Sequence, residues 1–262
     1  MNLLDLALQA GLLAHQSGAG THQTSLIIQR TAKALGVERV EVMISSTNIG
    51  ATLERGDERE TGFRKAPHMG ANFSLLTSLD QWLDTLETQS SLVLVDSATA
   101  TFIDSNHIQA AKEALDEIAQ RAIHYPSWLI TLLVGVSCGA FAALFSGDLA
   151  AILITTFGAA LGMAVRFFLV LRHFKPVVFA TVASLVALLT VGLLRHLSDT
   201  PDAALAASVL FLIPGVPLIN GAGDLLNGNY LNGMARLAMS AVIIVGIAIG
   251  VSLALRVLGI ER

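Results

Sequence analysis

The sequence predicts an α-helical polytopic membrane protein with an N-terminal α+β domain, and three observations lead to this fold class. Of its 262 residues, 53% are hydrophobic and only 14% are charged, whereas charged residues make up about a quarter of an ordinary soluble domain. Five apolar stretches follow Pro126, each near the roughly 20 residues that cross a bilayer core. Residues 1–125 carry a net charge of −6, whereas residues 126–262 carry +2. We therefore expect a cytoplasmic α+β domain at 1–125 and a five-helix transmembrane domain at 126–262.

Composition and motifs set several classes of protein aside. The acidic N-terminal half has no basic patch of the kind that nucleic-acid binding needs. The single cysteine, Cys138, has no partner for an intramolecular disulfide and fits a packing role. The start of the chain lacks a basic segment and includes Asp5, so we expect no secretory signal and a cytoplasmic N-terminus. No Walker motif and no H-E-x-x-H spacing occur, so we expect neither ATP, nor a metal, nor another cofactor.

Residues 1–125 alternate between helical and strand-like patterns. Apolar residues at helical spacing predict helices, and the turn-forming SGAGT separates the first two. Alternation with β-branched residues predicts a strand, and GDERETGFRK is suited to be its hairpin partner. The stretch 90–105 fits either a helix extension or a short strand with a loop. The predicted helices lie at 3–16, 23–36, 74–89 and 106–125, the last leading to the membrane, and the predicted strands lie within 37–54 and 56–65.

The second half contains the five predicted spans. The first, third and fifth have no charged residue, which is rare in a soluble core helix of that length. Three spans carry glycines four residues apart, a pattern that allows close approach of helices in lipid. The spans are expected at 128–145, 149–171, 176–194, 203–226 and 237–255, with glycine pairs Gly135/Gly139, Gly158/Gly162 and Gly246/Gly250.

The distribution of Lys and Arg near the span ends indicates an orientation. With the N-terminal half inside, Arg172, Lys175 and Arg236 lie on the cytoplasmic side, and Arg195 is the cation nearest the outer loops. Arg256 counts against this assignment. An odd number of crossings then places the C-terminus outside.

The fourth predicted span is interrupted in the stretch FLIPGVPLINGAGDLL. Pro214 and Pro217 each remove a backbone donor, so we expect the helix to kink or divide there. The half-helix after the break would point its N-terminus toward a cavity, as in transporters that hold carboxylates. Asn220 and Asp224 share one face of this half-helix. Asp224 is either a proton acceptor or cation partner in a transport path, or a residue at the cytoplasmic interface of a merely kinked helix.

Two arginines near the spans each have two readings. Arg166, inside the second span, either reaches the headgroups or faces the bundle and pairs with Asp224 or a substrate carboxylate. For Arg236, at the start of the fifth span, an interfacial anchor is the favoured role and an anion contact the alternative.

A polar cluster in the N-terminal half raises a different possibility. His15, Ser17, His22 and Thr24 lie around HQSGAGTHQTS, but no nucleophile elbow of the G-x-S-x-G type accompanies them. A helix-helix turn capped by polar residues explains the cluster equally well. A membrane-anchored hydrolase, or a sensor acting through the N-terminal domain, therefore remains only an alternative function.

At this point the residues resemble a known family. PGVPLINGAGDLLNGNYLNGMARLA resembles the PG-hydrophobic-PL-I-N, downstream Asp and G-hydrophobic-A-R pattern of the threonine/serine exporter family. The runs YPSWLITLLVGVSCGAF, VRFFLVLRHFKP and ALGVERVEVMISS are similar to it as well, so the resemblance covers nearly the whole chain in order. In length, the chain looks like the smaller, YjjP-like subunit type.

The resemblance implies a transporter rather than an enzyme, located in a bacterial inner membrane. It implies export of threonine and serine, as for fused members, or of succinate, as for the two-subunit type. It also implies a second small membrane subunit as partner, because five spans provide only half of an inverted-repeat transporter. The residues that match the motif, and that we expect to form or support the substrate path, are Pro214, Gly215, Pro217, Asn220, Asp224, Arg236 and Arg166, with Gly233 as a further match.

Overall fold

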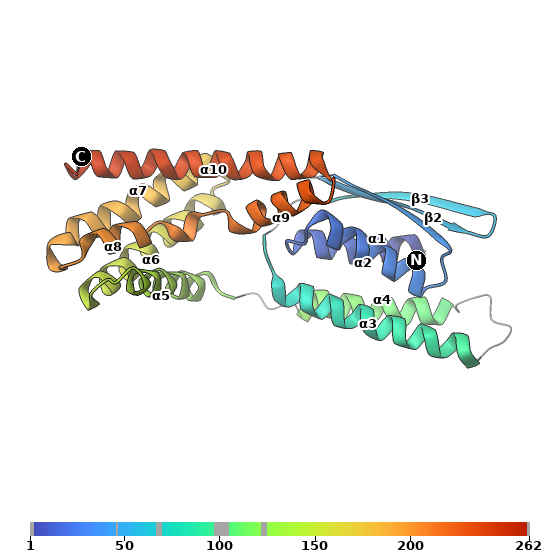
Figure 1. The fold of residues 1–262 in the computed structure, drawn as a ribbon. Helices are drawn as coiled ribbons and strands as arrows, with labels where there is room; N and C mark the ends of the chain where they lie inside the picture. Colours follow the sequence, from blue (N-terminus) through green and yellow to red (C-terminus); the bar gives the residue numbers. More distant parts are fainter. Residues whose placement is uncertain (1–2, 46, 67–69, 97–104, 122–124, 261–262) are drawn as a thin grey trace. The chain divides into compact units, whose positions relative to one another are not determined.

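The computed structural model describes residues 3–45, 47–66, 70–96, 105–121 and 125–260 (Figure 1). The chain divides into two compact units. The first unit comprises Met1–Ile123 together with Val216–Leu237, and the second comprises His124–Gly215 together with Ala238–Arg262. A segment from the predicted membrane half therefore belongs with the N-terminal residues.

The first unit contains the elements predicted for an α+β domain. Helix α1 matches the predicted bounds, and α2 ends before Gly36, whose φ of +82° suits glycine after a helix. The predicted extension of the third helix is confirmed as far as Asp96, and residues 97–104 lie outside the described residues. The elements are α1 (Leu3–Gln16), α2 (Thr21–Ala34), β1 (Arg39–Ile44), β2 (Asn48–Arg55), β3 (Glu58–Lys65), α3 (Phe73–Asp96) and α4 (Ser105–Arg121).

The sheet has three antiparallel strands in the order β1-β2-β3. The stretch 37–54, predicted as one strand, forms two, because the chain turns back where Ser45 N–H donates to the Asn48 carbonyl (2.8 Å). The predicted hairpin return is β3, which pairs Glu58 with Arg55 across a turn at Gly56. Gly56 has a φ of +57°, a conformation that glycine adopts without strain.

Helices α1 and α2 form the middle layer of the first unit. They contact the sheet on one side and the α3–α4 pair on the other (Figure 1). Fully buried side chains from each layer meet in one core, and Trp82 of α3 donates to the Ala111 carbonyl of α4 (3.2 Å). The core residues include Leu6, Leu8, Ile28, Ile49, Leu79, Leu83 and Leu115.

The second unit is helical in its described part. Among the residues that the structure describes, four helices are long and apolar enough to cross a membrane: Ser127–Leu144, Leu149–Leu171, Pro176–Leu197 and Tyr230–Val257. A bent pair, Pro201–Leu212 with Gly215–Leu226, adds a fifth if it is counted as one span. These segments contain α5 (Ser127–Leu144), α6 (Leu149–Leu171), α7 (Pro176–Leu194), α8 (Pro201–Ala207), α9 (Gly215–Leu226) and α10 (Tyr230–Val257).

Glycine allows close helix packing in the second unit, as its spacing predicts. A methyl group at Gly135 of α5 would lie 2.6 Å from the Thr156 carbonyl oxygen of α6. At Gly246 of α10 it would lie 2.8 Å from the Val177 carbonyl oxygen of α7. Thr181 and Ser184 of α7 also donate to the Gly246 (3.0 Å) and Ile247 (3.3 Å) carbonyls of α10, so small residues and interhelical hydrogen bonds join these helices.

Asp148 joins two loops at one end of the second unit. Its carboxylate caps α6 by accepting from Ala151 N–H (2.7 Å), and it also accepts from the Ser198 hydroxyl (2.7 Å) and Asp199 N–H (2.9 Å). These hydrogen bonds lower the pKa of Asp148 to about 2, and the bond from Ser198 makes the largest contribution. The loop before α6 and the loop before α8 therefore lie together.

Candidate functional site

The candidate site begins at the break that the two prolines predict. The short 3-10 helix Leu210–Leu212 ends before Pro214, and Ile213 has the extended backbone that precedes a proline. Helix α9 then starts at Gly215, with Pro217 in its first turn, where a missing N–H leaves no helical hydrogen bond unmade. The two halves differ in direction by 63°. The sequence therefore located the break correctly.

Asp224 of α9 is the centre of a group of buried polar contacts in the first unit. Its Oδ1 accepts from Thr21 N–H (3.1 Å), and its Oδ2 accepts from the Thr21 hydroxyl (2.9 Å). The same Oδ2 pairs with Arg236 Nε (3.1 Å). Asp224 is only 2% exposed. A buried carboxylate requires such partners, because an unpaired charge away from water costs several kcal/mol.

Two further hydrogen bonds attach the same elements to the turn between α1 and α2. Asn220 Nδ2 donates to the Gly18 carbonyl (2.8 Å), and Arg236 Nη2 donates to the Ala19 carbonyl (3.4 Å). Asn220 and Asp224 thus contact the same turn from one face of α9, as their spacing predicts. We name this arrangement the Asp224 cluster; it consists of Gly18, Ala19, Thr21, Asn220, Asp224 and Arg236.

The turn between α1 and α2 is shaped to receive this carboxylate. Gly18 has a φ of +95°, which a residue with a side chain rarely adopts. The N-cap of α2 is Gly20, which offers no side-chain acceptor to the free N–H groups of the first turn. Asp224 supplies that acceptor from α9, and its negative charge lies at the positive end of the helix dipole.

Thr21 is the residue of the cluster that sequence reasoning missed. The polar residues around SGAGT predicted a helix-helix turn, which is what His15, Ser17, His22 and Thr24 flank in the structure. His15 and Ser17 are buried, and the Thr24 hydroxyl donates to the Gly20 carbonyl (2.9 Å). One signal was available: a helix start with glycine at the N-cap, which leaves the first N–H groups to an acceptor from elsewhere.

Helices α9 and α10 pack closely where Gly233 faces α9. A methyl group at Gly233 would lie 2.8 Å from the Leu225 side chain and 2.9 Å from the Gly221 carbonyl oxygen. Only glycine leaves room for this approach, which brings Arg236, one turn further along α10, to Asp224. This explains physically why a glycine lies three residues before the arginine.

Arg166, Pro214 and Gly215 belong to the second unit. The Arg166 guanidinium lies 5.5 Å from the ring centre of Phe179 on α7 and 3.6 Å from Met163 Sδ on its own helix. The cation paired with Asp224 is Arg236. The two interpretations of Arg166, and those of Arg236 as an interfacial anchor or an anion contact, stay predictions.

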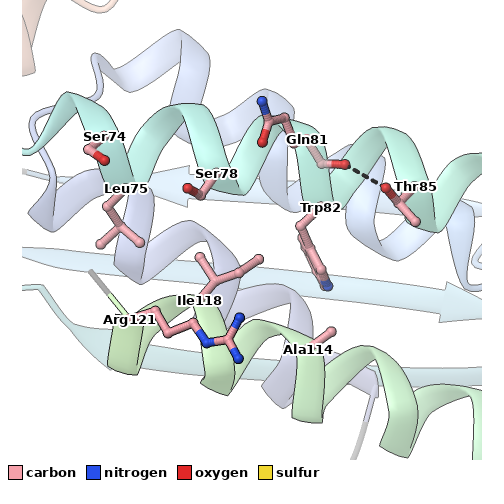
Figure 2. Close-up of a pocket in the computed structure, with 9 residues that line it drawn as sticks. All are labelled: Ser74, Leu75, Ser78, Gln81, Trp82, Thr85, Ala114, Ile118 and Arg121. Atoms are coloured by element: carbon pink, nitrogen blue, oxygen red, sulfur yellow. Dashed lines mark hydrogen bonds between the residues drawn. The ribbon is translucent and has the colours of Figure 1, made fainter. Parts of the chain in front are cut away.

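A separate cavity of about 480 Å³ lies between α3 and α4 (Figure 2). Trp82 and Ile118 supply its apolar part, and Ser74, Ser78 and Thr85 line the α3 side. The hydroxyl of Thr85 donates within α3 to the Gln81 carbonyl (2.9 Å). Arg121 of α4 also lines the cavity, and it forms an ion pair with Glu117 one turn earlier in the same helix. The positive charge of Arg121 at this cavity is thus paired with a carboxylate of its own helix, α4.

A chain with several apolar helices, a helix broken at a proline and a buried ion pair has features typical of membrane transport proteins. The family model described as "Putative threonine/serine exporter" matches residues 5–258 of the chain. The chain therefore belongs to the threonine/serine exporter family, as its motifs suggested.

Three relatives of differing length are similar to this chain. The "Probable succinate transporter subunit YjjP" of Escherichia coli K12 is 32% identical, over 98% of this chain and 94% of its own length. A protein of the same description from Klebsiella aerogenes is 31% identical with the same coverage. The "Probable threonine/serine exporter" of Mycobacterium tuberculosis is 25% identical over 97% of this chain, but over only 46% of its own length. No solved structure matches the chain.

Proposed function

We propose that this chain is one subunit of a secondary exporter that moves small carboxylate-bearing metabolites out of the bacterial cytoplasm. A dicarboxylate such as succinate is the first candidate substrate, and threonine or serine is the alternative. The length of the chain favours the dicarboxylate over threonine or serine, because the chain spans 94% of the relatives described as succinate transporter subunits and 46% of the longer exporter. A proton or ion gradient would supply the energy.

The observation that carries the proposal is the buried pairing of Asp224 with Arg236 beside a broken helix, in a chain of this family. Charged groups within apolar helices are costly and usually serve a substrate or ion path. Arg236 pairs with a carboxylate, so a substrate carboxylate has the chemistry to compete with Asp224 for it. We assign Pro214, Gly215, Pro217, Asn220, Asp224, Arg166 and Arg236 to forming or supporting the substrate path.

We further propose five spans in a bacterial inner membrane, with residues 1–125 cytoplasmic and the C-terminus outside. Relatives described as subunits support a partner, for which we propose a second small membrane protein of the same family. Association of the two chains would complete the transporter. The longer relative, of which this chain matches only 46%, would contain the corresponding parts in a single chain. An assembly of several copies of each chain is consistent with this proposal.

The test is export from cells that express the chain together with its candidate partner. We expect succinate in the medium to rise only when both chains are present, and Asp224→Asn to lower the initial rate about tenfold. The amide keeps the size of the side chain but removes the charge that pairs with Arg236, and hydrogen bonds to charged groups contribute about 1.5–3 kcal/mol. Metabolite analysis of the medium and immunoblots of the membrane fraction provide the measurement.

The outcomes separate the parts of the proposal. Unchanged export by Asp224→Asn would remove Asp224 from the mechanism. Export of threonine or serine in place of succinate would select the alternative substrate class. Equal metabolite levels with and without the two chains would contradict the transport function itself.

A further inference from the structure

We infer that Thr21 is a positioning residue of the exporter: it holds the Asp224 carboxylate against Arg236 and so makes the N-terminal domain part of the transport machinery. This inference rests on the proposed function and adds to it a residue from a part of the sequence that the substrate path did not include. Thr21 lies 203 positions before Asp224.

Thr21 makes two hydrogen bonds to one carboxylate. Its N–H donates to Oδ1 and its hydroxyl donates to Oδ2, so both oxygens of Asp224 are held by a single residue. Two donors on opposite oxygens fix both the position and the rotation of the carboxylate plane. Arg236 then approaches one defined oxygen, Oδ2.

The hydrogen bonds to the turn from Asn220 and Arg236 serve a different purpose from that of the Thr21 hydroxyl. Asn220 and Arg236 reach main-chain carbonyls of Gly18 and Ala19, and these bonds place the turn without touching the carboxylate. If the Thr21 hydroxyl is lost, Oδ2 keeps Arg236 and Oδ1 keeps one N–H. The Oδ2 atom would then lose the hydroxyl donor that it shares with Arg236 Nε, and the hydroxyl would no longer support their pairing.

Both Thr21 and Asp224 are buried. Thr21 is 5% exposed and Asp224 is 2% exposed, so water has little access to substitute for a missing hydroxyl. Removing one donor leaves a buried carboxylate oxygen with fewer hydrogen bonds to offset the free energy of taking it out of water. The effect of a change at Thr21 is therefore expected to reach Asp224 rather than be absorbed by solvent.

The test compares variants of nearly equal shape in the co-expressed exporter. Thr21→Val removes the hydroxyl, and we expect succinate export to fall about tenfold, the effect of losing one hydrogen bond to a charged group. Thr21→Ser keeps the hydroxyl and should recover most of the export. Thr31→Val is the matched control, because the buried Thr31 hydroxyl donates only within α2, to the Ile27 carbonyl (2.8 Å).

A second measurement distinguishes positioning of Asp224 from general support of the fold. The melting temperature of the detergent-solubilised protein is measured for Thr21→Val, Asp224→Asn and the double variant. We expect Thr21→Val to lower the melting temperature in the wild-type background and to have little further effect once Asp224→Asn is present. Such non-additivity is the signature of two groups in direct contact.

Two results would overturn the inference. One is export by Thr21→Val equal to that of Thr31→Val, and the other is an undiminished effect of Thr21→Val in the Asp224→Asn background. Failure of the proposed function has a different signature, since then the wild-type pair of chains exports nothing, or Asp224→Asn exports normally. The melting measurement needs no transport and therefore tests the contact in either case.

Discussion

At the scale of single residues, the Asp224 cluster shows which contacts a sequence pattern can predict. The spacing of Asn220 and Asp224 predicted one helix face, and the structure brings both to the same turn. Thr21 was missed because its partner is 203 residues away and no periodic pattern links them. Arg236 was selected from the motif, and its pairing with Asp224 could not be predicted because it depends on how α9 and α10 fold together.

The loop carboxylate Asp148 gives a prediction of pH dependence. Its folded pKa is lowered from 3.8 to about 2 by hydrogen bonds, mainly from Ser198. Its stabilising contribution is therefore complete above about pH 4 and is lost as the pH falls through about 2. We expect Asp148→Asn to melt below wild type at pH 7, with the difference shrinking between pH 4 and pH 2.

The measurement is the melting temperature of both solubilised proteins over this pH range. The asparagine keeps an acceptor for the start of α6, so the variant isolates the charge of the carboxylate from its role as a helix cap. A difference between the two proteins that stays constant down to pH 2 would show that the charge of Asp148 contributes nothing to stability.

At the scale of elements, local patterns predicted helices better than strands and boundaries. The pattern over 37–54 was correct in type, but it could not show that two strands share it, because the turn at Ser45 lacks Gly or Pro. The break at Pro214 was predictable because proline acts locally. That Val216–Leu237 joins the first unit was not predictable, because an apolar helix suits lipid and a protein surface equally well.

The close packing of α9 and α10 yields a prediction with an internal control. Gly233→Ala places a methyl group 2.8 Å from the Leu225 side chain, and we expect the melting temperature and export both to fall. Overpacking of this kind costs about 1–3 kcal/mol. Gly223→Ala, on α9 with no atom within 4 Å of the added methyl group, should be tolerated.

Both variants are compared with wild type by melting of the solubilised protein and by export with the partner. Equal behaviour of Gly233→Ala and Gly223→Ala would contradict the requirement for close approach between the two helices.

At the scale of the whole molecule, the chain forms two compact units, and each is made of two separate segments of the sequence. The charge difference between the halves of the sequence suggested a single boundary near Pro126. In the structure the first unit takes up a second segment, Val216–Leu237, after the chain has passed through α5 to α8. Composition averages over long windows, so it cannot detect a segment of this length whose partners are distant in sequence.

The proposed orientation is testable by cysteine labelling. In a Cys138→Ala background, Asp57→Cys in the β2–β3 turn should react with a membrane-impermeant maleimide only after the cells are permeabilised. Asp199→Cys should react in intact cells, because its loop and the loop at Asp148 lie together at one end of the second unit. The reverse labelling pattern would invert the proposed topology, and labelling of both in intact cells would contradict the cytoplasmic assignment.

The acceptor that α2 takes from Asp224 also has a consequence for biosynthesis. The ribosome makes the N-terminal helices first, yet the residue that completes the start of α2 follows only after α5 to α8 have been made. During synthesis, the first unit must therefore wait in an incomplete form until α9 and Arg236 emerge. Completion of the N-terminal unit therefore shows that α5 to α8 have already been synthesised.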